Sequence, residues 1–201
     1  MNVFDVRNVV RQPDALLAVT ENPRHRAILL NFRRHALLEV SGRWQEILRP
    51  DMIVDVPCYR INENGTSLRL RGTAEIGAFY AGITEARANV FGPITEHVAV
   101  ADWGLAIESF FGHHLPGRVL AEQGEDIDDP DAYYQLTHYM ASFWPYDADC
   151  RLIGEHIYED TGSRRLEKMD PANVITPEKA RELLAPLFDS APPGPGPAPH
   201  E

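Results

Sequence analysis

The sequence predicts an α+β fold, in which a cone-shaped, curved antiparallel sheet wraps over N-terminal helices. Three observations predict it. The composition before Pro93 favours helices, the segments after Pro93 are strand-like, and no second apolar run of comparable length is left over for another domain. Because helices must cover one face of such a sheet, the space that remains between the two layers can form a pocket.

Helical signals fill most of the first half of the chain. Residues 23–48 favour helix, and Ser41-Gly42 divides this segment into two helices. Residues 52–56 form a β-rich run that we interpret as the first strand. Another helix begins near residue 72, with Thr73 as its expected N-cap.

Strand signals dominate the second half. Four strands are expected, at residues 94–101, 105–113, 133–143 and 151–158. The acidic stretch at residues 122–131 is predicted to be a solvated loop. Thr176-Pro177-Glu178 has the cap, the first-turn proline and the early acid of a helix start, so a last helix should cover the body.

These elements define one domain at residues 23–188 with a tail at each end. Residues 1–22 are expected to form an arm that packs on the body or on a second subunit. Residues 189–201 are rich in Pro and Gly and have nothing to bury, so we expect them to be disordered.

The composition excludes several classes of partner. The 201-residue chain has a net charge of −11 spread along its length, which argues against a phosphate backbone as partner. Cys58 and Cys150 are too few for a disulfide framework and lack the spacing of a zinc site. The first thirty residues contain charges throughout and no long apolar stretch. We therefore expect a cytoplasmic protein without nucleic-acid or membrane partners.

Three local stretches carry a resemblance to a known superfamily. They are Arg-Gly-Thr-Ala-Glu-Ile-Gly-Ala-Phe-Tyr-Ala at 71–81, Thr-Glu-His-Val-Ala-Val at 95–100 and Gly-Glu-His-Ile-Tyr-Glu-Asp at 154–160. With the element order, they resemble the nuclear-transport-factor-2-like (SnoaL-like) superfamily over roughly residues 24–160. Its members include ketosteroid isomerases, scytalone dehydratase, limonene epoxide hydrolase, SnoaL cyclases and diarylpropane lyases. The resemblance implies a cystatin-like α+β barrel whose closed end holds a small hydrophobic molecule.

Departures from the superfamily disfavour two of its reactions. In comparison with ketosteroid isomerase, Phe32 replaces the oxyanion-hole tyrosine, Val56 replaces the base aspartate, and Tyr139 replaces the protonated aspartate. The two catalytic aspartates of limonene epoxide hydrolase fall on Ala99 and Ile157. Steroid isomerisation and epoxide hydrolysis by those mechanisms are therefore not expected.

The first candidate catalytic pair is His97 with Asp55. The resemblance implies that His97 points into the cavity, and strand alternation would then place Ala99 beside it. An imidazole titrates near neutral pH, which suits it to accept a proton and return it, while a carboxylate can fix its tautomer. The alternatives are a histidine held by a backbone carbonyl at the core edge, and an Asp55 that lies at the surface or caps a helix.

The second set of candidates is Tyr59, Tyr80 and Glu155. The resemblance places Tyr80 where ketosteroid isomerases have an active-site tyrosine, so Tyr59 or Tyr80 should donate to a developing oxyanion. Glu155 should face inward as a proton donor or second base, the alternative being a salt bridge with Arg60 or Arg151 at the sheet rim. Substrate contacts are predicted from Phe32, Ile53, Phe79, Ala99, Tyr139 and Ile157.

The sequence predicts neither a metal nor an organic cofactor. It contains no phosphate-binding glycine loop, no dinucleotide fingerprint and no Gly-x-Ser-x-Gly motif. A metal-dependent oxygenase that uses His113, His114 and an acid is an alternative, but these separations form no compact ligand motif. His138 is expected on the face opposite Tyr139, outside the main cavity.

The function that these predictions favour is a cofactor-independent acid/base lyase. It would dehydrate a hydrophobic oxygenated aromatic or polycyclic molecule, or cleave a carbon–carbon bond in a retro-aldol manner with release of a small aldehyde. The alternatives are an isomerase or cyclase of the ketosteroid or SnoaL type, and a non-catalytic ligand-binding or assembly module. A homodimer or homotrimer is expected.

Overall fold

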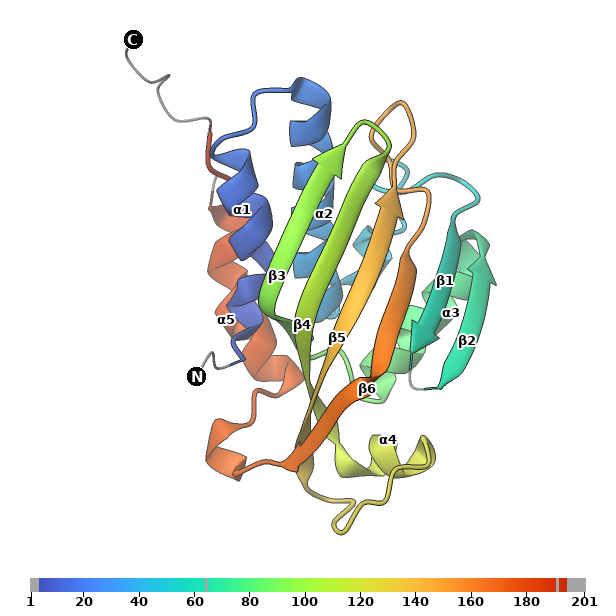
Figure 1. The fold of residues 1–201 in the computed structure, drawn as a ribbon, viewed down its shortest axis with the longest axis vertical. Helices are drawn as coiled ribbons and strands as arrows, with labels where there is room; N and C mark the ends of the chain where they lie inside the picture. Colours follow the sequence, from blue (N-terminus) through green and yellow to red (C-terminus); the bar gives the residue numbers. More distant parts are fainter. Residues whose placement is uncertain (1–3, 64, 191, 195–201) are drawn as a thin grey trace.

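The computed structural model describes residues 4–63, 65–190 and 192–194, and within them helices pack on one six-stranded sheet (Figure 1). The strands are β1 (Cys58–Glu63), β2 (Thr66–Arg71), β3 (Phe91–Ala101), β4 (Gly104–Pro116), β5 (Tyr133–Pro145) and β6 (His156–Lys168). The α-helices are α1 (Arg11–Leu17), α2 (Pro23–Val40), α3 (Gly72–Glu85), α4 (Gly117–Glu122) and α5 (Pro177–Asp189). The α+β class predicted from the sequence is confirmed.

The sheet is mixed and open, with the order β2-β1-β6-β5-β4-β3. Neighbouring strands are antiparallel except β1 and β6, which run parallel. The prediction of a wholly antiparallel sheet is therefore wrong at one junction. After the β1–β2 hairpin the chain crosses through α3 to the far edge of the sheet at β3. It returns through β4, α4, β5 and β6, each strand antiparallel to the one before it, and this brings β6 alongside β1.

Helix α2 forms the centre of the helical layer. Asn22 caps it by accepting hydrogen bonds from the backbone N–H groups of Arg24 and His25, and Pro23 occupies the first turn. The helix ends at Ser41, as the Ser-Gly pair predicts. The sheet covers one side of α2, and α1 and α5 cover the other (Figure 1).

The N-terminal segment packs on this body. The 3-10 helix η1 (Val6–Val10) buries Val6, Val9 and Val10, and α1 buries Leu17. Both helices contact α2 and β3. The predicted C-terminal tail begins where α5 ends at Asp189, and residues 191 and 195–201 of that tail lie outside the described residues.

Two predicted strands differ from the structure. Residues 52–56 form turns and an isolated bridge between Ile53 and Leu152, so their apolar side chains fill the core from irregular backbone. The last strand begins at His156, five residues later than predicted, and continues to Lys168. The β1–β2 hairpin was not predicted, although Leu68 and Leu70 alternate with Arg69 and Arg71 in β2, a short and largely exposed strand.

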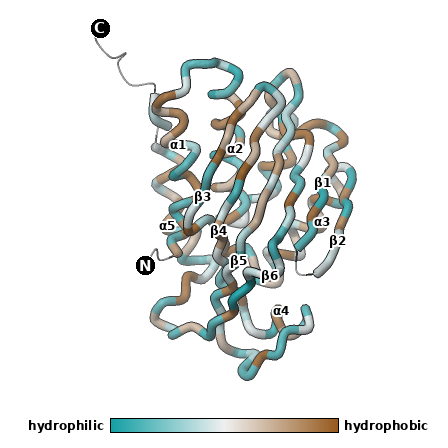
Figure 2. The backbone as a smooth tube through the Cα atoms, in the orientation of Figure 1, coloured by the Kyte–Doolittle hydropathy of each residue, from teal (hydrophilic) through white to brown (hydrophobic). Residues whose placement is uncertain are grey.

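A bulge in β3 decides which of its side chains face inward. The pairing register of β3 with β4 shifts between Pro93 and Thr95. One inserted residue exchanges the two faces of the strand that follows it. A second register shift leaves residues 161–164 of β6 without a pairing partner in β5, whereas β5 itself pairs with β4 without interruption. Figure 2 shows hydrophilic positions interspersed with hydrophobic ones along the strands, as expected when helices cover only one face.

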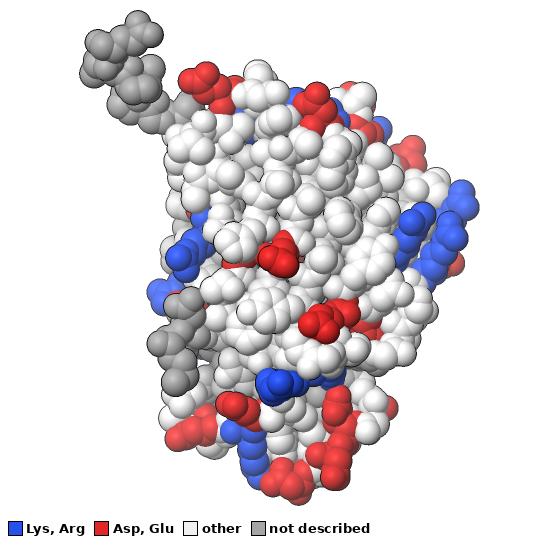
Figure 3. Space-filling view, in the orientation of Figure 1, with Lys and Arg blue, Asp and Glu red and all other residues white. Residues whose placement is uncertain are grey.

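The outer face of the sheet carries aromatic side chains, which we name the outer aromatic strip: Trp103, Phe110, Tyr139, Phe143 and Tyr158. Ring centroids lie 6.4 Å apart for Trp103 and Phe143, and 6.3 Å apart for Phe143 and Tyr158. Figure 3 shows that this face has few charges, while basic side chains gather over β1 and β2. Among the described residues, none of the helices combines the length and apolar character that crossing a membrane requires.

Candidate active site

An apolar cavity of about 120 Å³ lies between the helices and the inner face of the sheet. Its aromatic lining consists of Phe32, Phe79, Phe91, Phe111 and Trp144. A cavity of about 150 Å³ holds benzene in another protein, so this one approaches the size of a single aromatic ring. A second cavity of about 280 Å³ adjoins it and shares lining residues that include Ile61, Glu63 and His113.

Four acidic side chains line the first cavity: Glu39 from α2, Glu63 from β1, Glu96 from β3, and Glu155 from the segment before β6. Burying carboxyl groups among aromatic rings is costly unless each group is paired or protonated. The partners of these carboxyls therefore decide what the cavity can do chemically.

A buried hydrogen-bond network surrounds Glu155. The Tyr80 hydroxyl donates to Glu155 Oε1 at 2.8 Å and also lies 3.0 Å from the Tyr59 hydroxyl. His35 Nε2 lies 3.1 Å from Glu155 Oε1, 3.1 Å from the Tyr80 hydroxyl and 3.5 Å from Glu39 Oε2. Glu155 and His35 are 3% and 0% exposed, so water does not screen these contacts.

The network fixes the charge of its members. Burial alone would lower the pKa of His35, but the charges and hydrogen bonds of Glu155 and Glu39 outweigh it and raise that pKa from 6.5 to about 9. Burial, with the charge of Glu155, raises the pKa of Glu39, although contact with His35 opposes this. At neutral pH His35 is therefore an imidazolium, and Glu39 retains its proton more readily than a surface glutamate does.

Glu96 lies apart from this network. Its Oε1 accepts a hydrogen bond from the Ser109 hydroxyl at 3.3 Å, whereas its buried Oε2 has no hydrogen-bond partner among the described residues. Burial raises the pKa of Glu96 to about 7, despite the opposing effect of Ser109. A carboxyl group with this pKa and a free oxygen can accept and return a proton near neutral pH.

The prediction that His97 points into the cavity is wrong. His97 and Ala99 are exposed on the outer face, while the neighbouring Glu96 faces inward. The bulge between Pro93 and Thr95 sets this alternation. Asp55 is also exposed, in the loop before β1, and β1 and β3 are separated by three strands. Asp55 therefore cannot orient His97, and the proposed pair is excluded.

The other candidates divide between inner and outer positions. Tyr59, Tyr80 and Glu155 come together as described, and Phe32, Phe79 and Ile157 line the cavity. Ile53 is buried in the core but is not among the lining residues.

One placement on β5 was predicted incorrectly. Tyr139, expected to contact substrate, is 52% exposed on the outer face. Strand β5 pairs with β4 without interruption, so its regular alternation turns Leu136, Ser142 and Trp144 inward and Tyr139 outward. His138 lies on the face opposite Tyr139, as predicted, and although it is fully buried it is not among the residues that line the two cavities.

Three important residues were missed in the sequence. His35 and Glu39 are spaced four residues apart on α2, which places both on one helix face, and this spacing was a usable signal. Glu96 is adjacent to His97, so the correct strand was identified with the wrong face. No sequence feature marks the bulge that decides between the two faces.

Together, the fold and the site define an α+β protein with an acid-lined aromatic cavity. No protein-family model matches the sequence, and no curated protein matches it. Among solved structures, the chain is similar to an NTF2-like protein from Anabaena variabilis, with 12% identity, a TM-score of 0.50, and coverage of 71% of this chain and 95% of that one.

The chain is also similar to a protein from Shewanella putrefaciens that is described as a SnoaL-like polyketide cyclase. Their identity is 11%, with a TM-score of 0.50 and coverage of 80% of this chain and 92% of the other. The chain therefore has the nuclear-transport-factor-2-like fold, as its resemblance to that superfamily predicts. At this level of identity the likeness concerns the fold and not the reaction.

Proposed function

We propose that this protein is an acid/base lyase that acts on a small, oxygenated aromatic molecule. The observation that carries the proposal is Glu96, whose Oε2 has no hydrogen-bond partner among the described residues of an aromatic cavity. Its pKa of about 7, raised by burial, makes it a base that is half ionised near neutral pH. Glu96 takes the role that the sequence assigned to His97.

Glu39 supplies the acid of the proposed pair. It lines the same cavity from α2, on the helical side, while Glu96 lines it from β3. The raised pKa of Glu39, caused first by burial, favours its protonated form. Tyr80, with Tyr59 behind it, and His35 hold Glu155 in place, so they act as positioning residues.

This pair supports elimination of water. The Glu96 carboxylate takes a proton from carbon, the electrons of that C–H bond form a double bond, and the C–O bond of the leaving hydroxyl breaks. Glu39 gives its proton to the departing hydroxyl, which leaves as water. In a retro-aldol cleavage, Glu96 would instead take a hydroxyl proton, the C–C bond would break to release a small aldehyde, and Glu39 would protonate the carbon that keeps the electron pair.

The size and lining of the cavity favour an aromatic substrate. The cavity of about 120 Å³ approaches the volume that one ring needs, and the adjoining 280 Å³ would accept a substituent or a second ring. Five aromatic side chains around it supply edge and face contacts. A polycyclic substrate would have to occupy both cavities.

The test is a panel of hydroxylated monocyclic and bicyclic aromatic compounds, screened by thermal shift and followed by product analysis of every binder. The Glu96→Gln variant should lose at least a hundredfold in kcat, because a positioned base contributes about this much. Since the base must be ionised, wild-type kcat/KM should rise with pH on its acid limb, with a midpoint near 7.

Two surface variants serve as matched controls. Glu108→Gln makes the same chemical change on the exposed face of β4. His97→Ala removes an exposed imidazole from the residue of β3 that pairs with Glu108 in the sheet. Both should retain wild-type turnover. Binding without conversion across the panel would favour a ligand-binding module instead, and undiminished turnover in Glu96→Gln would reject Glu96 as the base.

A further inference from the structure

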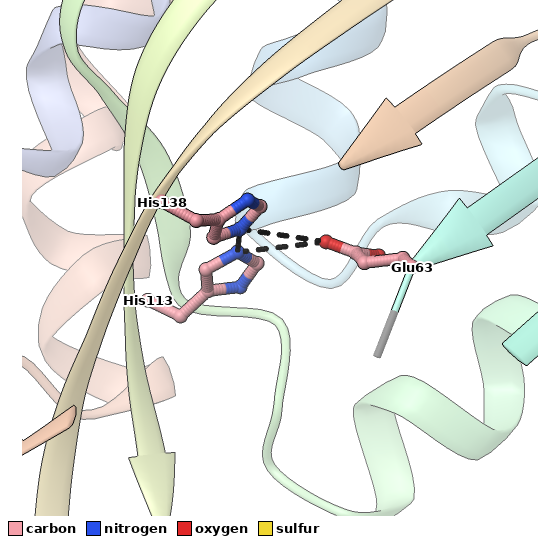
Figure 4. Close-up of side chains that lie close together, drawn as sticks. All are labelled: Glu63, His113 and His138. Carbon is pink, nitrogen blue, oxygen red and sulfur yellow. Dashed lines mark hydrogen bonds and ion pairs between the residues drawn. The ribbon is translucent and has the colours of Figure 1, made fainter. Parts of the chain in front are cut away.

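Three potential metal ligands converge between the two cavities. Glu63 ends β1, His113 lies on β4 and His138 on β5, and their side chains point toward one another (Figure 4). His113 Nε2 and His138 Nε2 are 3.0 Å apart, and each lies 3.7 Å from Glu63 Oε1. None of the three takes part in the acid/base pair proposed above.

The separations match those of ligands around one small ion. A point equidistant from the three atoms would lie about 2.0 Å from each, given sides of 3.0, 3.7 and 3.7 Å. Zinc binds imidazole nitrogen at about 2.0–2.1 Å and carboxylate oxygen at about 2.0–2.2 Å. Three ligand atoms at these separations can therefore all reach one ion of this size.

The surroundings of His138 prepare it as a ligand. The side chain is fully buried, and its Nδ1 lies 3.3 Å from the Tyr139 carbonyl oxygen and 3.7 Å from Glu159 Oε1. A proton on Nδ1 satisfies these oxygens and leaves the lone pair of Nε2 directed at the cluster. A carbonyl or carboxylate behind a liganding histidine is the usual arrangement in metal sites.

We propose that Glu63, His113 and His138 form a site for one divalent transition metal ion, Zn²⁺ or Fe²⁺. Two imidazoles and one carboxylate are a donor set that both ions accept. Glu63 and His113 line both cavities, so the remaining coordination positions would face the space where a ligand can enter. His114 is not part of the site, because its Nδ1 accepts a hydrogen bond from the Ile175 N–H at 3.0 Å.

Metal binding is measured on the full chain without reference to turnover. Chelator-treated protein is titrated with Zn²⁺ and, anaerobically, with Fe²⁺ by calorimetry, and the bound metal is counted by elemental analysis after dialysis. We expect one ion per chain, with Mg²⁺ failing to compete. Co²⁺ should give the visible absorption of a site with nitrogen and oxygen ligands. Absence of binding at millimolar metal would overturn the proposal.

Variants locate the site. Glu63→Gln and His113→Asn should each weaken Zn²⁺ binding at least a hundredfold, whereas His97→Asn, which removes an exposed imidazole, should leave it unchanged. Circular dichroism checks that each variant is folded. Imidazole NMR of the wild-type protein provides a test that needs no variant. Zn²⁺ should shift the signals of His113 and His138 among the eight histidines, and shifts confined to other histidines would refute the assignment.

Discussion

Replacing Glu155 with glutamine tests the buried network through the pH dependence of stability. In the folded protein the pKa of His35 is raised from 6.5 to about 9, with the charge of Glu155 as the main cause that opposes burial. A group whose pKa rises on folding stabilises the protein fully below its unfolded pKa and loses that contribution as pH rises through its folded pKa. The contribution of His35 is thus present at pH 6 and lost by about pH 9.5.

The expected magnitude follows from that pKa. Raising it from 6.5 to about 9 corresponds to about 3 kcal/mol of stability. Breaking a buried ion pair on one side costs a similar amount, so Glu155→Gln should be about 3 kcal/mol less stable than wild type at pH 6. At pH 9.5 His35 is neutral in both proteins. The difference in free energy of unfolding between Glu155→Gln and wild type should therefore narrow by about 2 kcal/mol or more.

The assay is urea unfolding of both proteins at pH 6 and pH 9.5, with the difference between them as the quantity of interest. Titrating groups that lie far from Glu155 are common to both proteins and cancel in that difference. Glu167→Gln, the same change at an exposed position of β6, should show no pH-dependent difference from wild type. A difference between Glu155→Gln and wild type that stays constant over this pH range would refute the charge assignment of the network.

Two further predictions concern packing and association. A Cβ at residue 154 would overlap the Cys58 carbonyl oxygen, so Gly154→Ala should lower the free energy of unfolding in urea by about 3 kcal/mol. Gly82→Ala lies in α3, and nothing lies within 4 Å of its new Cβ, so it should instead raise the free energy of unfolding by about 0.5–1 kcal/mol. Equal changes in stability in the two variants would contradict this reasoning. If the outer aromatic strip forms the contact of a homo-oligomer, Phe143→Arg should reduce the sedimentation coefficient toward that of a monomer, whereas Val19→Arg, at an exposed site outside the strip, should not.

Much of the fold was predictable because local signals agree with the tertiary structure. The Thr176-Pro177 start of α5, the end of α2 at Ser41 and the long central strands all follow from capping and strand propensity. The β1–β2 hairpin was signalled in the sequence but missed. Leu68 and Leu70 alternate with Arg69 and Arg71, and the Asn-Gly pair at 64–65 is a typical hairpin turn sequence.

The site was less predictable because it depends on register. Strand alternation determines side-chain directions only after the bulges are known. The bulge after Pro93 turns Glu96 into the cavity and His97 toward the outer face. The proposed metal site depends on three strands, since Glu63, His113 and His138 meet only when β1, β4 and β5 take their places in one sheet. Their sequence separations carry no information about that meeting.

The acidic lining of the cavity is costly to the fold, and this cost gives a last test of function. Glu96 has a folded pKa of about 7, raised by burial from 4.5, so its ionisation destabilises the folded state as pH rises. Full stability is present below pH 4.5 and about 3 kcal/mol is lost by pH 8. Glutamine cannot ionise, so Glu96→Gln should match wild type in urea unfolding at pH 4.5 and exceed it by up to about 3 kcal/mol at pH 8.

A structural role and a catalytic role for Glu96 therefore predict opposite results. If the carboxyl served the fold, its replacement would lower stability at both pH values, and the proposal of a general base would lose its foundation. If it serves catalysis, the same variant gains stability at pH 8 and loses turnover, which is the exchange expected where a protein keeps an unfavourable group for its reaction. Glu108→Gln, exposed on the outer face, should change neither property.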